Sequence, residues 1–225
     1  MKQSTPKHAY AKLLLSGAVL TIVLFSALLF GGASLSPSEA LGGLFGIGTD
    51  TEIIIMQSIR LPRVLGACLA GIGLSVSGVL LQSVTDNALA SPNVIGVNAG
   101  AGFAVILLLA TLPALSPLLP LAALLGAFFA TLIIVGIAGH IDSSRATVIL
   151  AGIALTALLN AAISLISLID TDVLASYSYF SIGGLSGVAL EDLFLPAALI
   201  FLSLAVSLLL SRHIEVLKLG DTVAA

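Results

Sequence analysis

The chain has 225 residues, of which 59% are hydrophobic and 8% are charged, and its mean hydropathy is +1.22. A soluble domain carries about 25% charged residues, so this composition excludes a water-soluble globular protein and predicts an integral membrane protein. The net charge of −3 and the absence of a basic cluster in the sequence argue against nucleic-acid binding. The single cysteine, Cys68, can form no intrachain disulfide and is interpreted as a packing residue.

The intervals that lack charged residues predict six transmembrane helices in an all-α, polytopic fold. One interval, 87–141, is too long for a single span of about 20 residues, and Pro113 and Pro117 divide it at a turn. The first apolar run is long enough to span, so we interpret it as a retained helix rather than a cleaved signal peptide. Each span must be helical, because lipid cannot satisfy free backbone groups. The predicted spans are at about 13–32, 64–84, 94–112, 118–138, 147–169 and 193–211.

The distribution of lysine and arginine predicts cytoplasmic N- and C-termini. With this orientation, six basic residues lie on the cytoplasmic side: Lys2, Lys7, Lys12, Arg145, Arg212 and Lys218. Only Arg60 and Arg63 lie on the other side, in or next to the segments 33–59 and 170–192, which we predict to be extracytoplasmic. In the second segment, Tyr177, Tyr179 and Phe180 are typical of a short interfacial helix.

Arg60 and Arg63 flank Pro62, which is well tolerated in the first turn of a helix. Two arginines at the outer side oppose the positive-inside bias, and two interpretations are open. One interpretation is that both side chains snorkel to lipid phosphates. The other is a docking site for carboxylates of an extracytoplasmic partner, since guanidinium groups pair carboxylates bidentately.

Polar side chains at two depths of the predicted bundle are candidates for a transport path. Gln82 and Asn87 lie at the cytoplasmic end of a span rich in small residues, where they are either interfacial residues or part of a gate. Asn98, Thr156 and Asn160 lie within membrane depth. These three either hydrogen bond to neighbouring helices or line a cavity.

Several catalytic classes find little support in the sequence. Gly-Leu-Ser-Gly at 184–187 matches the nucleophile motif of rhomboid-type proteases, but the histidines, at 8, 140 and 213, are all predicted on the opposite side of the membrane from Ser186. There is no G-x-x-x-x-G-K-[ST] loop, so ATP hydrolysis is expected on another chain. No intramembrane cluster of His, Cys or acidic residues predicts a site for a bare metal ion.

Six separated motifs carry a family resemblance over essentially the whole chain. They are Arg60-Leu61-Pro62-Arg63, the small-residue span with Ser77-Gly78 and Gln82, Asn87-Ala88-Leu89-Ala90-Ser91-Pro92 with Gly96 to Gly102, Leu150 to Leu155, Gly183 to Gly187, and Leu217 to Asp221. In this order they resemble the FecCD family, the permeases of type II ABC importers for iron-siderophore, haem or cobalamin.

The resemblance implies a permease that moves an iron chelate, most simply a siderophore, across the bacterial plasma membrane. It implies a second permease subunit, two cytoplasmic ATPases that bind ATP and Mg²⁺, and an extracytoplasmic binding protein that docks on Arg60 and Arg63. By the same resemblance, Asn87 and Leu89 belong to the cytoplasmic gate together with Gln82. Leu219, Gly220 and Asp221 belong to a coupling loop that begins within 212–225. No cofactor is expected on this chain.

The chain also departs from the family pattern. Ala88 stands where the family has a proline, and the chain has no tryptophan. Family members typically have ten spans, so we expect residues 1–225 to form one incomplete permease domain, from a fragment or a truncated product. The alternatives are a module that only binds the ATPase or binding protein without transport, and an importer of haem or cobalamin.

Overall fold

The computed structural model of the protein describes residues 6–93, 96–141 and 145–211, and these ranges contain helices and loops but no strand. The described residues form two compact units. The first unit is drawn from 1–72 and 185–201, and the second from 73–184 and 202–225. Two of the three unit boundaries fall within continuous helices, α4 (Leu61–Thr85) and α9 (Phe194–Leu209), and the third lies in the loop between Gly184 and Leu185.

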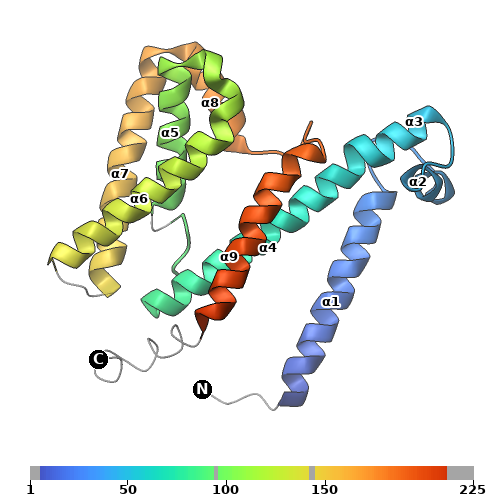
Figure 1. Cartoon of the computed structure of the whole chain (residues 1–225), viewed down its shortest axis with the longest axis horizontal. Helices are drawn as coiled ribbons and strands as arrows, with labels where there is room; N and C mark the ends of the chain where they lie inside the picture. The colour runs from blue at the N-terminus through green and yellow to red at the C-terminus, as the bar shows by residue number, and fades with distance from the viewer. Residues whose placement is uncertain (1–5, 94–95, 142–144, 212–225) are drawn as a thin grey trace. The chain divides into compact units, whose positions relative to one another are not determined.

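The first unit begins with the long helix α1 (Pro6–Leu29), followed by the short helices α2 (Pro37–Leu44) and α3 (Asp50–Ile53) (Figure 1). Both short helices start with a capping box, in which Ser36 pairs with Glu39 and Thr49 with Glu52. Hydrogen bonds from the backbone N–H and the side chain of Ser36 lower the pKa of Glu39 below its usual value. These caps satisfy the first backbone N–H donors of α2 and α3, so local hydrogen bonds stabilise both short helices between α1 and α4.

A seven-residue π-helix, η1 (Ile54–Arg60), joins α3 to α4. At its end the N–H of Leu61 donates to the carbonyl of Met56, five residues back. Pro62 follows directly; it is fully buried, has no N–H and would crowd the carbonyl four residues before it. The wider π turn accommodates this ring and still continues the helix into α4.

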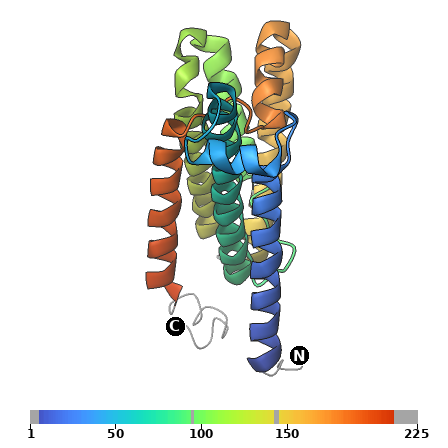
Figure 2. The ribbon, with the colours of Figure 1, turned by 90° about the vertical axis from the view of Figure 1, so that its right-hand side faces the viewer.

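The second unit is built on an antiparallel hairpin of α5 (Val97–Thr111) and α6 (Leu119–Ile141), joined by the 3₁₀ turn η2 (Pro113–Leu118) (Figures 1 and 2). Gly100 and Gly126 face each other in this hairpin, and a Cβ on Gly100 would lie 2.6 Å from the carbonyl oxygen of Gly126. Small residues therefore let the two backbones approach closely, as in membrane helix pairs.

Helices α7 (Arg145–Ile169) and α8 (Thr171–Ile182) complete the second unit by packing on α5. Asp170 caps α8, since its carboxylate accepts from the N–H groups of Asp172 and Val173. A buried cluster holds α5, α7 and α8 together, and its members are Val105, Ile106, Leu109, Ile163 and Val173. The position of α8 is thus set by apolar burial of its first turn.

The prediction of an all-helical membrane protein is confirmed, with one difference among the spans. Within the described ranges, five helical stretches are long and apolar enough to cross a membrane: Tyr10–Leu29, Asp50–Thr85, Pro113–His140, Ala146–Ile169 and Glu191–Leu209, the last comprising η3 (Glu191–Leu193) and α9. The stretch predicted as a span at 94–112 is helical only at Val97–Thr111, 15 residues. At 1.5 Å per residue this is about 22 Å, less than the roughly 30 Å of a bilayer core.

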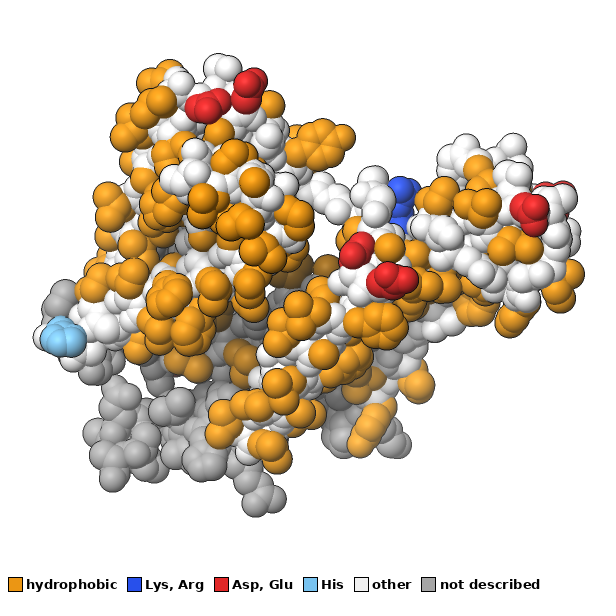
Figure 3. Space-filling view, turned by 45° about the horizontal axis from the view of Figure 1, so that its top comes forward, with side chains coloured by type: hydrophobic (Ala, Val, Ile, Leu, Met, Phe, Trp, Pro, Cys, Tyr) orange, Lys and Arg blue, Asp and Glu red, His pale blue; other side chains and the backbone are white. Residues whose placement is uncertain are grey.

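Hydrophobic side chains cover much of the surface in view, and acidic side chains gather near helix ends (Figure 3). Exposed leucine, isoleucine, valine and phenylalanine side chains occur on all the long helices. This surface is the opposite of that of a soluble protein, and it is the one expected of helices that contact lipid or other membrane helices.

Candidate functional site

A cavity of about 590 Å³ in the second unit lies among the start of α5, the middle of α7 and the end of α8. Its polar lining consists of Asn93, Asn98, Thr156, Asn160, Tyr177 and Ser181. The three residues proposed from the sequence to line a path are therefore brought together. Asn98 and Asn160 are exposed and both line this space, and their role in a transport path stays a prediction.

Gly96 sets the start of α5 against α7. Its φ of +88° lies in the left-handed region that favours glycine, and a Cβ here would lie 2.9 Å from Oγ1 of Thr156. Oγ1 of Thr156 donates to the carbonyl of Gly152 at 2.7 Å, and Nδ2 of Asn98 donates to Oδ1 of Asn93. A side chain at position 96 would push the two helices apart, so this glycine places Asn98 opposite Thr156.

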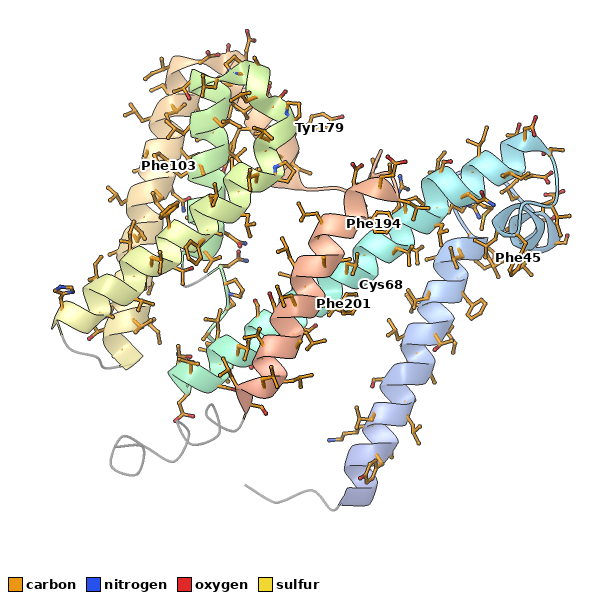
Figure 4. All side chains as sticks on the ribbon, in the orientation of Figure 1. Phe45, Cys68, Phe103, Tyr179, Phe194 and Phe201 are labelled. Atoms are coloured by element: carbon orange, nitrogen blue, oxygen red, sulfur yellow. The ribbon has the colours of Figure 1, made fainter. Side chains whose placement is uncertain are left out.

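Aromatic side chains of α8 form another wall of the cavity. Tyr177 and Phe180, three residues apart on one helix face, both line it, and their ring centroids are 6.5 Å apart. The Tyr177 hydroxyl sits over Gly102, where a Cβ would lie 2.7 Å from it. Tyr179, on another face, is 88% exposed and projects away from the helices (Figure 4).

The sequence predicted a short helix here, and α8 confirms it, but the inward role of Tyr177 and Phe180 was missed. The spacing of three residues was the available signal, since residues i and i+3 share a helix face. The lining is uncharged and offers amide and hydroxyl groups beside aromatic rings. Such a lining can hydrogen bond and stack with a neutral or charge-masked organic group.

The gate candidates Asn87 and Leu89 lie in a tight turn after α4. Asp86 ends the helix with φ +48°, and Oδ1 of Asn87 accepts from the N–H of Leu89 at 2.9 Å. This side chain–backbone bond is an Asx turn. Ala90 is buried beside Ile134. In this turn the Leu89 side chain is 83% exposed. Gln82 is also exposed, and its backbone carbonyl accepts from the N–H of Asn87 at 3.3 Å.

Arg60 is buried at the end of α1, with an exposed fraction of 7%. Its Nη1 donates to the carbonyls of Leu28 and Leu29 at 2.8 and 2.7 Å, and its Nη2 donates to that of Ala33 at 2.7 Å. The carbonyls of Leu28 and Leu29 are ones that the end of α1 leaves without intrahelical partners, and Ala33 lies just beyond that end. The guanidinium thus caps α1, and its charge also complements the negative end of the helix dipole.

Gly31 makes room for this cap, because a Cβ there would lie 3.1 Å from Nε of Arg60. Arg63 differs from Arg60, since its side chain is exposed and its Nη2 donates to Oγ of Ser186 at 3.3 Å. Leu185 packs on Gly66, where a Cβ would lie 3.0 Å from the leucine side chain. The segment 183–187 is thereby held against the first turns of α4. Docking by either arginine stays a prediction.

The other residues considered from the sequence are Ser186 with the histidines, a possible metal cluster, and Leu219, Gly220 and Asp221. Ser186 is paired with a guanidinium, which cannot act as a general base, and the described His140 places Nδ1 2.7 Å from the carbonyl of Gly136 in its own helix. Among the described residues, no three His, Cys, Asp or Glu side chains group as a metal site would require. Leu219, Gly220 and Asp221, predicted to couple to an ATPase, lie outside the described residues.

Comparison with known proteins identifies relatives for this arrangement. The model of the FecCD transport family matches residues 19–225. The ferric enterobactin transport system permease protein FepD of Escherichia coli is 36% identical over 213 residues, which cover 92% of this chain and 64% of FepD. The vitamin B12 import system permease protein BtuC of Vibrio vulnificus is 32% identical, covering 97% of this chain and 65% of BtuC.

A solved structure of a metal-chelate type ABC transporter in an inward-facing conformation has the same fold. It superposes with a TM-score of 0.75 at 28% identity, and the match covers 95% of this chain and 65% of the transporter chain. The chain therefore spans less than two thirds of the length of each of these three relatives. The relatives are named as transport proteins, not as enzymes.

Proposed function

Because the chain belongs to the FecCD transport family, we propose that it is a permease subunit of an ABC importer that carries an iron chelate into the cell. The observation that supports a transport role most directly is the cavity that unites Asn98, Thr156 and Asn160. Its uncharged lining suits a cargo whose metal charge is already masked by a chelator, such as a ferric siderophore. It does not suit a bare cation, which would require anionic or imidazole ligands.

The partners follow from the family and are part of the proposal. We infer cytoplasmic ATPase subunits that hold ATP and Mg²⁺, a second permease subunit that is either identical or related, and an extracytoplasmic binding protein. Of the two arginines proposed for docking, the exposed Arg63 is free to exchange its single 3.3 Å contact with Ser186 for a carboxylate. Arg60 would have to release the end of α1 first.

The proposed path has its cytoplasmic gate at Gln82, Asn87 and Leu89. The Asx turn at Asn87 fixes the backbone that presents the exposed Leu89, so a leucine side chain can close a pore without a charged group. Ala88 lacks the ring of the family's proline, and the Asn87 side chain is the local restraint on this turn. The termini are proposed to be cytoplasmic, as the lysine and arginine distribution predicts.

The cavity assignment is tested by uptake of a radiolabelled ferric siderophore into cells that express this protein with its ATPase and binding protein. We expect Asn160→Leu to lower uptake about fivefold or more, because it removes an amide that can hydrogen bond to cargo. Ser164→Ala, one turn along α7, is the matched control, since the Ser164 hydroxyl donates to the carbonyl of Asn160 and is not among the described residues that line the cavity.

The outcomes separate the site from the function. Equal uptake in Asn160→Leu and the unmodified protein would remove this cavity from the path while leaving the family intact. Uptake of haem or cobalamin in place of the siderophore would keep the path and change the cargo. The BtuC relative is named for vitamin B12 import, so all three cargoes belong in the assay.

A further inference from the structure

A second cavity, in the first unit, is an open pocket bordered by the C-terminal end of α1, η1 and the first turns of α4. Its volume is about 460 Å³, within the usual range of small-molecule sites. Seven apolar residues form most of its wall: Ala27, Phe30, Ala33, Ile55, Ile59, Val64 and Ala67. Water gains few hydrogen bonds from such a wall, whereas a hydrocarbon chain would bury apolar surface against it.

Arg60 and Arg63 complete the wall of this cavity. The hydrogen bonds that their guanidinium groups make within the described part of the chain all end on neutral oxygen atoms, three carbonyls for Arg60 and one hydroxyl for Arg63. Two positive charges beside an apolar space therefore lack a compensating negative charge among these contacts. An anion at this place would be attracted by both, and more strongly than in bulk water.

The position of the cavity along the helices indicates where that anion comes from. Tyr10–Leu29 and Asp50–Thr85 are both long and apolar enough to cross a membrane, and the cavity lies at the end of the first and beside Arg60 and Arg63 in the second. Arginines near the end of a spanning helix reach the level of the lipid headgroups. Phospholipids place a phosphate at this level, joined through a glycerol backbone to two acyl chains.

We propose that this cavity binds one anionic phospholipid, with an acyl chain between α1 and α4 and its phosphate against Arg63. Arg63 supplies the hydrogen bonds, since its side chain is exposed and, among the described residues, is held by one 3.3 Å contact, with Ser186. The guanidinium geometry matches a phosphate oxygen pair. Arg60 contributes fixed positive charge, because its Nη atoms are engaged with the end of α1. The lipid phosphate uses the same guanidinium that the docking proposal assigns to a carboxylate, so lipid and binding protein would compete for Arg63, while lipid binding itself requires no binding protein.

Native mass spectrometry of the purified protein, with no binding protein present, tests the site by titration with phosphatidylglycerol. We expect one tightly bound phosphatidylglycerol, retained about tenfold better than the zwitterionic phosphatidylcholine. Arg63→Gln should abolish this preference for phosphatidylglycerol, because it removes a charge-assisted hydrogen bond to the phosphate. Ala67→Phe should weaken both lipids by filling the space for the chain while both charges stay in place.

Matched controls lie on α1 away from the cavity. Lys12→Gln removes an exposed positive charge of α1, as the control for Arg63→Gln. Ala18→Phe adds a phenyl ring at an exposed alanine of α1, as the control for Ala67→Phe. Both should bind lipid like the unmodified protein. Inorganic phosphate, added alone, should not displace the lipid. Retention of phosphatidylglycerol in both Arg63→Gln and Ala67→Phe would overturn the proposal, as would full displacement by inorganic phosphate, which would indicate a simple anion site.

Discussion

Arg60 and Arg63 lie three residues apart, yet their guanidinium groups have different surroundings. Arg60 is 7% exposed and closes the end of α1 through three hydrogen bonds of 2.7 to 2.8 Å, whereas Arg63 is exposed and makes one of 3.3 Å. The pair therefore combines a structural residue with an accessible one. Both arginines are exceptions to the positive-inside rule, and each has its own physical surroundings: Arg60 caps α1, and Arg63 is accessible.

Arg60→Met should destabilise the protein, and Arg63→Met should not. Methionine keeps the length and apolar body of the side chain but leaves the carbonyls of Leu28, Leu29 and Ala33 without these donors. Loss of buried charge-assisted hydrogen bonds and of the helix-dipole contact corresponds to about 2–3 kcal/mol. The thermal midpoint of the purified protein in detergent measures the difference.

The matched variant Arg63→Met loses one exposed hydrogen bond, so its midpoint should stay close to that of the unmodified protein. Gly31→Leu provides a second route to the same loss, because its side chain would displace the guanidinium of Arg60. Equal midpoints for Arg60→Met and Arg63→Met would show that the cap on α1 contributes nothing to stability.

Much of the site could be predicted at the level of residue type, but the partners of each residue could not. Polar residues in apolar spans indicated Asn98, Thr156 and Asn160, because intramembrane polar groups are costly unless they bind something. The partners of Arg60 lie 27 to 32 residues away in the chain, and no local pattern specifies them. Tyr177 was likewise interpreted by its residue type, while its inward direction depends on the packing of α8 against Gly102.

At the scale of elements, charge-free intervals located the long helices but not their irregular ends. The stretch 94–112 was predicted as a full span, and the helix begins only at Val97, because Gly96 takes a left-handed conformation. The π-helix η1 was not predicted, since its five-residue hydrogen bonding arises from the demands of Pro62 in a packed helix. Hydropathy reports burial in lipid and is insensitive to these backbone details.

The α5–α6 hairpin depends on the close approach of two glycines, and Gly126→Ala should destabilise it. A Cβ at Gly126 would collide with the carbonyl oxygen of Gly100 and with the Cβ of Ala104. Forcing the helices apart should cost about 1–3 kcal/mol, the usual penalty of overpacking, and should outweigh the better helix propensity of alanine. A lower thermal midpoint in detergent is the expected result.

Gly136→Ala is the internal control for this effect, because the same substitution on the same helix meets nothing within 4 Å. Its midpoint should be unchanged or higher, since only the propensity term remains. If the two alanine variants had equal midpoints, the close approach of Gly100 and Gly126 would not be a determinant of stability.

At the scale of the whole molecule, charge bias and the length of α4 predict which chain segments share a side of the membrane. The hydrogen bond between Arg63 and Ser186 joins the first turn of α4 to one residue of the segment 170–192, which charge bias predicts to be extracytoplasmic. Helix α4 has 25 residues, or about 37 Å, enough to cross a bilayer core. Its two ends, near Arg63 and near Leu89, should therefore face opposite compartments.

Cysteine labelling in intact cells tests this topology, starting from a Cys68→Ala background that removes the only native thiol. Ser38→Cys and Ser186→Cys, both at exposed positions, should react with a membrane-impermeant maleimide added outside. Leu89→Cys, at a position that is 83% exposed, should react only after the membrane is permeabilised, because it lies beyond the other end of α4. Labelling of Leu89→Cys in intact cells would reverse the orientation, and with it the assignment of the docking and gate ends. Opposite accessibility of Ser38→Cys and Ser186→Cys would instead contradict the prediction that both segments are extracytoplasmic.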